Sequence, residues 1–417
     1  MPLLIRNGEI VNADRRFQAD ILCDGETITK IGPNLVAPPD AEVIDAAGKY
    51  VFPGFIDPHV HIHLPFMGTL AKDTYVTASR AALVGGTTTL IEMVCPARGD
   101  DPLEAYELWK ANAAGKSACD YTFHMGITRF DGETENVVRR IVADGTASLK
   151  IFLAYKGAFG IDDAELYQTL DLAKRLGVIV TAHCENAEIV SRLQQRLLAE
   201  GKTGPEWHEP SRPVTVEAEG VHHLATFAAL TGAHTYVVHT SCAEALGEAK
   251  AAQDRGLKMW VETVAPYLVL DSTYAELPGF EGAKYVMSPP LREAASRRHL
   301  GRNSLGPREH RGDRSRAVRF PRPKGNGARR FHEDSQRHPQ RRASRAFAVH
   351  ARRGPGPIGP EPLCGCGEYE SRRNFWALSA QGNDRRRQRR RSRGVRSCVS
   401  RQHHGGRPRD ERRLQRV

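Results

Sequence analysis

Seven short apolar runs dominate residues 52–265, and most are separated from the next by a helical stretch. The runs are rich in Val, Ile and Thr and do not alternate with polar residues, as expected for strands buried on both faces of a parallel sheet. They span 52–57, 87–94, 120–127, 148–155, 178–184, 235–241 and 259–265. The segment Asp163–Arg175 is typical of the intervening helices, because it starts with acidic residues and repeats Leu at helical spacing. The pattern predicts an α/β fold of the (β/α)₈ barrel type, with one strand still to come.

Residues before this pattern have a different character. Strand-like runs with turn residues between them cover Leu3–Val11, Ala19–Ile31 and Ala41–Val51. We therefore expect a small β-domain over residues 1–53, which is incomplete by itself, and a barrel over residues 54–292.

The composition changes sharply after Arg292. Residues 1–292 hold 26 Lys and Arg against 38 Asp and Glu, a net charge of −12, whereas residues 293–417 hold 34 against 11, a net charge of +23. Both periodicities stop there, so no eighth strand is expected in this tail. The cationic run Arg385–Arg393 leaves open an arginine-rich arm that binds nucleic acid.

The sequence gives no sign of membrane association. The apolar run at Leu3–Ile5 is too short for a signal peptide, and no stretch reaches the roughly 18–20 apolar residues that cross a bilayer. The eight cysteines are scattered, apart from Cys364 and Cys366. We interpret them as free thiols in a reducing compartment, which predicts a cytoplasmic location.

Four histidines stand at the ends of predicted strands. His59 and His61 are two residues apart, so their side chains project from the same face of a strand. His183 and His239 end two later strands, and the carboxyl ends of barrel strands meet at the face where catalytic groups lie. Imidazole nitrogen is a good ligand for Zn²⁺. Taken alone, His183 or His239 is more readily explained as a hydrogen-bonded histidine than as a ligand. We expect His124, His208, His222, His223 and His234 to be structural or surface residues.

Lys150 lies inside the apolar strand Ser148–Phe152. A charged amine in such a place is costly unless it is paired or modified. The side chain could extend to the barrel rim, or it could react with CO₂ to form a carbamate whose two oxygens bridge two metal ions. Spacing alone leaves both alternatives open.

Five segments together resemble the dihydropyrimidinase/D-hydantoinase family of the amidohydrolase superfamily, in family order over residues 1–292. They are Gly54–His61, Ser148–Phe152, Ala182–Asn186, Gly204–Pro213 and Met287–Arg292. The resemblance implies hydrolysis of the cyclic amide bond in dihydropyrimidines or 5-substituted hydantoins, small cyclic amides or ureides, to N-carbamoyl amino acids. It also implies a homo-oligomer, since relatives are commonly tetramers.

The resemblance further implies a centre with two divalent ions, Zn²⁺ above all. His59 and His61 would bind one ion, His183 and His239 the other, and Lys150 would bridge them as N6-carboxylysine. Tyr155 would donate a hydrogen bond to the developing oxyanion, although a packing role at the rim is an alternative, and Ser288 would hold the ring amide. Leu64 and Phe66 would form the pocket wall. His63 stands where dihydroorotase-like members have a carboxylate-binding arginine, which favours a neutral ring.

The tail departs from the family pattern. Relatives end their eighth strand in a Thr-Asp-His motif, whose aspartate binds metal and shuttles a proton, and later carry Pro-Asn-Gly-Ile-Pro, but residues 293–417 contain neither. One allowed coding of Gly312–Phe320, read one base later, gives A-T-D-H-A-P-F-D. The same offset turns Arg330–Pro339 into a run containing P-N-G-I-P, and Phe375–Asn383 into F-G-L-Y-P-R-K-G.

These matches predict a reading-frame change near residues 293–298, and a chain that as written folds poorly and is nearly inactive. The alternatives are the nucleic-acid-binding arm and a non-catalytic assembly protein on the same fold. Such assembly proteins lack the metal ligands, whereas this chain has all five.

Overall fold

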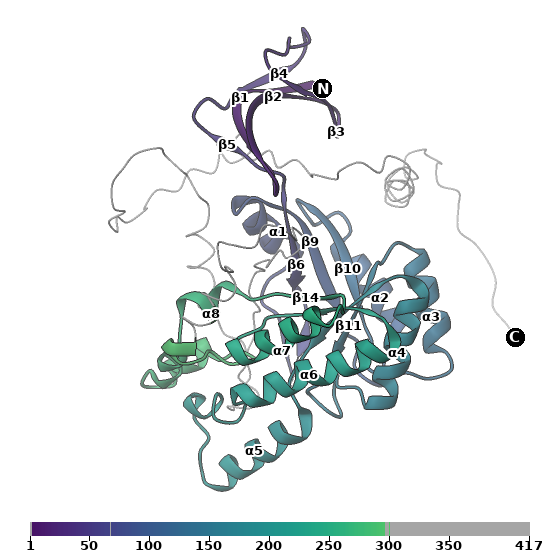
Figure 1. The fold of residues 1–417 in the computed structure, drawn as a ribbon, viewed down its shortest axis with the longest axis vertical. Helices are drawn as coiled ribbons and strands as arrows, with labels where there is room; N and C mark the ends of the chain where they lie inside the picture. Colours follow the sequence, from purple (N-terminus) through teal and green to yellow (C-terminus); the bar gives the residue numbers. More distant parts are fainter. Residues whose placement is uncertain (1, 67, 297–299, 301–417) are drawn as a thin grey trace, which may run out of the picture.

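The seven predicted runs form one curled parallel sheet in the computed structural model, which describes residues 2–66, 68–296 and 300 (Figure 1). Its order, β14-β13-β12-β11-β10-β9-β6, follows the sequence, so each strand lies beside the one before it. The strands are β6 Phe55–Val60, β9 Thr87–Val94, β10 Asp120–Gly126, β11 Ser148–Phe152, β12 Ile179–His183, β13 His234–Val237 and β14 Met259–Val261. All five residues of β11 are buried, as expected for a strand covered on both faces.

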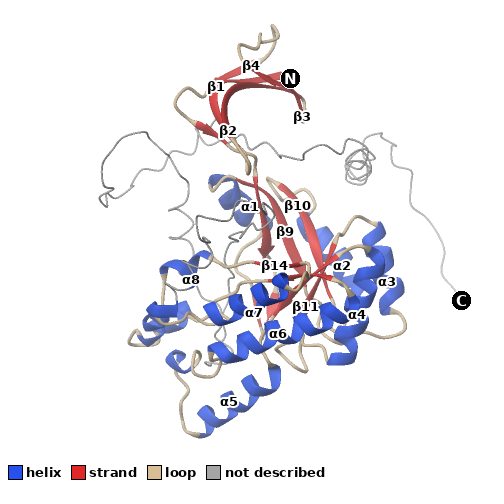
Figure 2. Ribbon diagram, in the orientation of Figure 1, coloured by secondary structure: helices blue, strands red, loops and turns tan. Residues whose placement is uncertain are grey.

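Helices flank this sheet along its outer side (Figure 2). They are α1 Tyr75–Val84, α2 Pro102–Ala113, α3 Thr134–Ala143, α4 Asp163–Leu176, α5 Ala187–Ala199, α6 Val214–Thr231, α7 Ala243–Asp254 and α8 Ala265–Val269, with 3₁₀ helices at Pro205–Trp207, Ser272–Glu276 and Glu281–Tyr285. A short hairpin, β7 Pro65–Phe66 with β8 Thr69–Leu70, follows β6. The alternation of strand and helix expected from the sequence is thus present, and the described residues form an open barrel of seven strands.

The helix α4 shows why the predicted boundaries hold. Asp162 caps its first turn and forms a capping box with Glu165, which satisfies amide groups that lack a partner within the helix. Leu166 and Leu170 are fully buried against the sheet side. The helix ends at Gly177, whose φ of 68° is a left-handed conformation that glycine adopts without strain.

The first 51 residues form a separate five-stranded sheet that stands apart from the helices (Figure 2). Its strands are β1 Pro2–Val11, β2 Arg16–Asp24, β3 Thr27–Gly32, β4 Glu42–Asp45 and β5 Tyr50–Val51, in the order β3-β2-β1-β4 with β5 also paired to β1. The second predicted run is a hairpin, because Gly25 turns the chain between β2 and β3. The sheet has its own small core, which includes Leu3, Ile5 and Ile21.

Three barrel strands are shorter than their apolar runs by three residues or more. β11 ends at Phe152 and β13 at Val237, because Tyr155 (φ 62°) and His239 (φ 44°) adopt left-handed conformations that no strand can contain. β14 ends at Val261, and Pro266 lies in the first turn of α8. The apolar run therefore overestimates strand length wherever the chain turns into the site.

Within the described residues no eighth strand joins the sheet, whose edges are β6 and β14. The predictions made for the tail, including the cationic run and the frame change, fall almost wholly outside the described residues. No helix in the described part of the chain is long and apolar enough to cross a membrane.

Candidate active site

The four candidate histidine ligands lie together at the carboxyl ends of barrel strands, and the fifth candidate, Lys150, is buried in the middle of β11, which pairs with β12. His59 and His61 are at the end of β6, Lys150 is in β11, His183 ends β12 and His239 follows β13 by two residues. All five side chains belong to buried residues. The convergence expected from parallel strands, whose carboxyl ends share one edge, is therefore present.

The four imidazole rings form a continuous cluster. Ring centroids are 5.3 Å apart for His59 and His61, 5.2 Å for His59 and His239, and 4.7 Å for His183 and His239. Nδ1 of His183 lies 3.0 Å from Nε2 of His239. Within residues 2–66, 68–296 and 300, however, no three His, Cys, Asp or Glu side chains form a ready site for a single ion.

Lys150 is fully buried in the middle of its strand. Its Nζ atom lies 4.6 Å from the centre of the Phe152 ring. Burial raises the pKa of Glu262, and the Lys150 charge acts against this rise, so the amine is within electrostatic reach of a carboxylate that contacts His59. The structure does not place the amine at a solvent-exposed rim, so the extended-lysine alternative does not describe this side chain.

Sequence reasoning missed two buried glutamates that hold the histidines. Nδ1 of His59 is 2.7 Å from Oε1 of Glu262, and Nε2 of His183 is 2.6 Å from Oε2 of Glu185. Glu262 directly follows β14 and Glu185 lies two residues after β12. Their positions at strand ends are the signal that singled out the histidines, so the same rule applied to acidic residues would have found them.

The two glutamates differ in charge state. Burial is the largest influence on Glu262 and, with the nearby Asp57, raises its pKa to about 8. Burial also acts to raise the pKa of Glu185, but the charge of Arg212 and the hydrogen bond from His183 outweigh it and lower the pKa to about 2. Glu185 is therefore an ionised carboxylate inside the protein.

An apolar pocket opens beside His61. Its lining is His61, Leu64, Phe66, Cys95, Phe152, Tyr155 and Phe159, with no Lys, Arg, Asp or Glu among them. Phe66 stacks on Phe159 with centroids 5.6 Å apart and meets the edge of Tyr155 at 5.7 Å. The Tyr155 ring lies 5.1 Å from that of His183. The predicted wall residues Leu64 and Phe66 are thus neighbours of Tyr155, and Phe152 and Phe159 are wall residues that the sequence did not single out.

Ser288 does not line this pocket, but it is connected to it. Its side chain hydrogen-bonds Tyr155, and its Oγ lies 3.1 Å from Nε2 of His208. His208, expected to be a structural or surface residue, is buried and also contacts the Met287 carbonyl oxygen at 3.0 Å. Burial raises the pKa of Tyr155, so its phenol stays protonated and able to donate a hydrogen bond.

Two other described histidines, His124 and His63, lie outside this cluster. His124 is buried between Ser148 and the carbonyl oxygen of Pro58, which agrees with a structural role. His63 packs its ring near Tyr75, at 6.2 Å between centroids, and is not in the pocket lining.

Comparison with known proteins gives a consistent answer. Residues 50–259 match the model of the amidohydrolase family. The chain belongs to the amidohydrolase family. It is 45% identical over 294 residues to a D-hydantoinase of Geobacillus stearothermophilus, covering 70% of this chain and 62% of the relative. It is 39% identical over 294 residues to dihydropyrimidinase 2 of Caenorhabditis briggsae, covering 70% and 57%.

A solved amidohydrolase structure extends the comparison. D-hydantoinase (dihydropyrimidinase) from a Thermus species superposes with a TM-score of 0.70 at 65% identity, covering 72% of this chain and 65% of that one. This chain thus spans less than two thirds of the length of these relatives. The resemblance seen in the sequence motifs is confirmed, and it extends to the fold.

Proposed function

We propose that this amidohydrolase hydrolyses the cyclic amide bond of a dihydropyrimidine or a 5-substituted hydantoin, giving an N-carbamoyl amino acid. The observation that carries the proposal is a cluster of four buried histidines, with Lys150 buried in the strand next to that of His183, beside a pocket that contains Tyr155. The D-hydantoinases and dihydropyrimidinases among the relatives are consistent with this substrate class.

The donor set fits a pair of divalent ions. Two histidines for each ion leave both short of ligands, and no third His, Cys, Asp or Glu supplies one among the described residues. Lys150, buried between β10 and β12, can fill that gap for both ions once its amine adds to CO₂, which forms an N–C bond and releases a proton. His59 with His61, and His183 with His239, would hold the ions, most suitably Zn²⁺.

The chain's own residues then account for binding and orientation. When bound, the ions supply a hydroxide near neutral pH and polarise the amide carbonyl. Tyr155 donates a hydrogen bond to the carbonyl oxygen as it gains charge, and Ser288 orients the ring amide. Leu64 and Phe66 cover the ring substituent and exclude water. The uncharged pocket lining favours a neutral ring over one that carries a carboxylate.

The frame-change hypothesis makes the test a comparison of two proteins. One is the 417-residue chain, and the other, the frame-restored protein, is translated after a one-base correction near residues 293–298. We expect about two zinc ions per subunit and hydantoin hydrolysis in the frame-restored protein, and little hydrolysis in the chain as written. A frame-restored protein that binds no metal would support the assembly-protein alternative. Ordinary turnover by the chain as written, or a gene with one intact frame, would overturn the frame hypothesis.

Three further predictions concern assembly, compartment and nucleic-acid binding. The homo-oligomer expected from the resemblance is tested by sedimentation of the purified protein. The described cysteines Cys23, Cys95, Cys119, Cys184 and Cys242 are all free thiols, which supports a reducing compartment such as the cytoplasm. Nucleic-acid binding by the tail requires a salt-sensitive affinity for RNA or DNA, which we do not expect.

A further inference from the structure

We infer that Arg212 is a positioning residue that fixes a candidate metal ligand, His183, and the candidate oxyanion donor, Tyr155, at the same time. The inference rests on the proposed function, since it concerns the ligands of the proposed centre. It adds a residue that lies outside the ligand set and outside the pocket lining.

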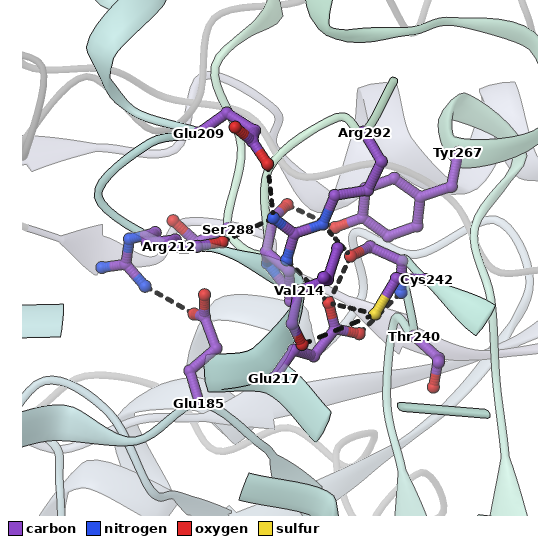
Figure 3. A network of polar contacts seen from close by, with 12 residues as sticks. Glu185, Glu209, Arg212, Val214, Glu217, Thr240, Cys242, Tyr267, Ser288 and Arg292 are labelled. Carbon is purple, nitrogen blue, oxygen red and sulfur yellow. Dashed lines mark hydrogen bonds and ion pairs between the residues drawn. The ribbon is translucent and has the colours of Figure 1, made fainter. Parts of the chain in front are cut away.

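The first link runs through a single carboxylate oxygen. Nη1 of Arg212 donates to Oε2 of Glu185 at 2.5 Å (Figure 3). The same oxygen accepts from Nε2 of His183 at 2.6 Å. With Nε2 committed to Glu185, Nδ1 of His183 is the nitrogen that faces His239. Carboxylates that hold the second nitrogen of a ligating histidine set its tautomer and its ring orientation.

The second link is a ring contact. The guanidinium carbon of Arg212 lies 5.3 Å from the centre of the Tyr155 ring. A planar cation over an aromatic face is attractive, more so when both groups are shielded from water. One buried guanidinium thus touches the support of His183 and the face of Tyr155.

Arg212 is itself held by a second buried arginine, Arg292. Nη1 of Arg292 donates to the backbone carbonyl oxygen of Arg212, while its Nη2 binds Glu217 at 2.9 Å and its Nε binds Ser241 at 2.9 Å (Figure 3). Ser241 lies two residues after His239. The network therefore ties the loop after β12 to the loop after β13. These loops adjoin or contain His183 and His239, the two histidines proposed to bind one ion.

Close backbone packing supports the same geometry. A side chain at Gly220 of α6 would meet the backbone of Cys184 and Glu185 at 2.7 Å, so α6 approaches this loop as closely as a glycine allows. The backbone that carries Glu185 is therefore held close to α6.

The test measures Co²⁺ and Zn²⁺ binding to the 417-residue chain and to the frame-restored protein. We expect Arg212→Met to weaken binding of the ion held by His183 and His239 by about 10–100-fold, with loss of its share of the visible Co²⁺ spectrum. Arg212→Lys keeps a cation beside Glu185 and should recover most of the affinity.

Arg98→Met is the matched control. Arg98 binds Glu165 at 2.6 Å, also as an arginine–glutamate pair, but it contacts none of the candidate ligands. Its loss should lower the melting temperature and leave metal affinity and the Co²⁺ spectrum unchanged.

The outcomes separate the inference from the proposed function. If neither unsubstituted protein binds metal, the proposed function fails and the inference with it. If metal binds and Arg212→Met has unchanged affinity and spectrum, only the inference fails. Should Arg212→Met not fold, Glu185→Gln breaks the same link from its acidic side. Unchanged affinity in that variant overturns the inference equally.

Discussion

Glu185 and Glu262 are both buried and each contacts a candidate metal ligand, yet their pKa values move in opposite directions. Glu185 accepts from His183 and has a pKa of about 2, whereas Glu262 contacts His59 and has a pKa of about 8. The charge of Arg212 lowers the pKa of Glu185, whereas the negative charge of Asp57 raises the pKa of Glu262 further. Depth of burial therefore does not decide whether a carboxylate in this site is charged; its nearest partner does.

The largest effect should come from replacing Lys150, which is proposed to bridge the ion near Glu185 and the ion near Glu262. Lys150→Met removes the only proposed ligand common to both ions, so we expect both to be lost, whichever glutamate supports the histidines. Metal content after dialysis measures this. Lys174→Met, at an exposed position on α4, should retain both ions. Retention of two ions by Lys150→Met would show that no bridging carbamate is needed.

Replacing each glutamate with glutamine in the metal-stripped protein tests whether Glu185 is ionised and Glu262 is protonated. Glu185→Gln leaves the Arg212 charge buried without its counter-charge, and we expect a loss of about 3–5 kcal/mol in the free energy of unfolding. Glu262→Gln replaces a carboxyl that is already mostly protonated at pH 7, so the loss should be much smaller. Urea unfolding measures both. Equal losses would mean that the two carboxylates have the same charge state.

The contributions of Glu185 and Glu262 to stability should change with pH in opposite directions. Glu262 has a folded pKa above its ordinary 4.5, so its contribution to the metal-stripped protein is complete below pH 4.5 and is lost as pH rises towards 8. Glu185 has a folded pKa below 4.5, so its contribution is present above 4.5 and is lost as pH falls towards 2. Stability curves of the two Gln variants, each subtracted from the unsubstituted curve, should slope in these directions. Curves of the same slope would contradict the assignment.

The smallest effect should come from an exposed carboxylate with a similar pKa. Hydrogen bonds from Arg175 and Arg139 lower the pKa of Glu135 to about 2, as for Glu185, but Glu135 lies at the surface. Glu135→Gln should change stability only slightly, and added salt should abolish the change, because exposed ion pairs are screened. If Glu135→Gln lowered stability as much as Glu185→Gln and salt did not change the effect, burial would not increase the contribution of an arginine–glutamate pair to stability.

The sequence predicted the barrel strands well because a buried parallel strand leaves a local mark, a continuous apolar run. It predicted the histidines for a related reason, since a polar residue directly after such a run must lie at the strand's end. Arg212 and His208 left no such mark. They lie in an irregular stretch before α6, and their partners, Glu185 and Ser288, are distant in sequence. Their roles depend on tertiary contacts that no local periodicity encodes.

The sequence also did not predict where the strands end. Tyr155 and His239 lie within or next to apolar runs, and nothing in the residue types announces their left-handed backbone. Both residues belong to the site, so the misplaced strand ends mark functional positions.

Arg292 sets a practical limit for anyone who shortens this protein. Its buried guanidinium donates hydrogen bonds to Glu209, Glu217, Ser241 and the carbonyl oxygen of Arg212. The carbonyl oxygen of Arg292 accepts a hydrogen bond from the amide of Ser272. A stop codon in place of Arg292 would therefore remove all of these contacts at once, whereas a stop codon after Arg292 would retain the residue that makes them.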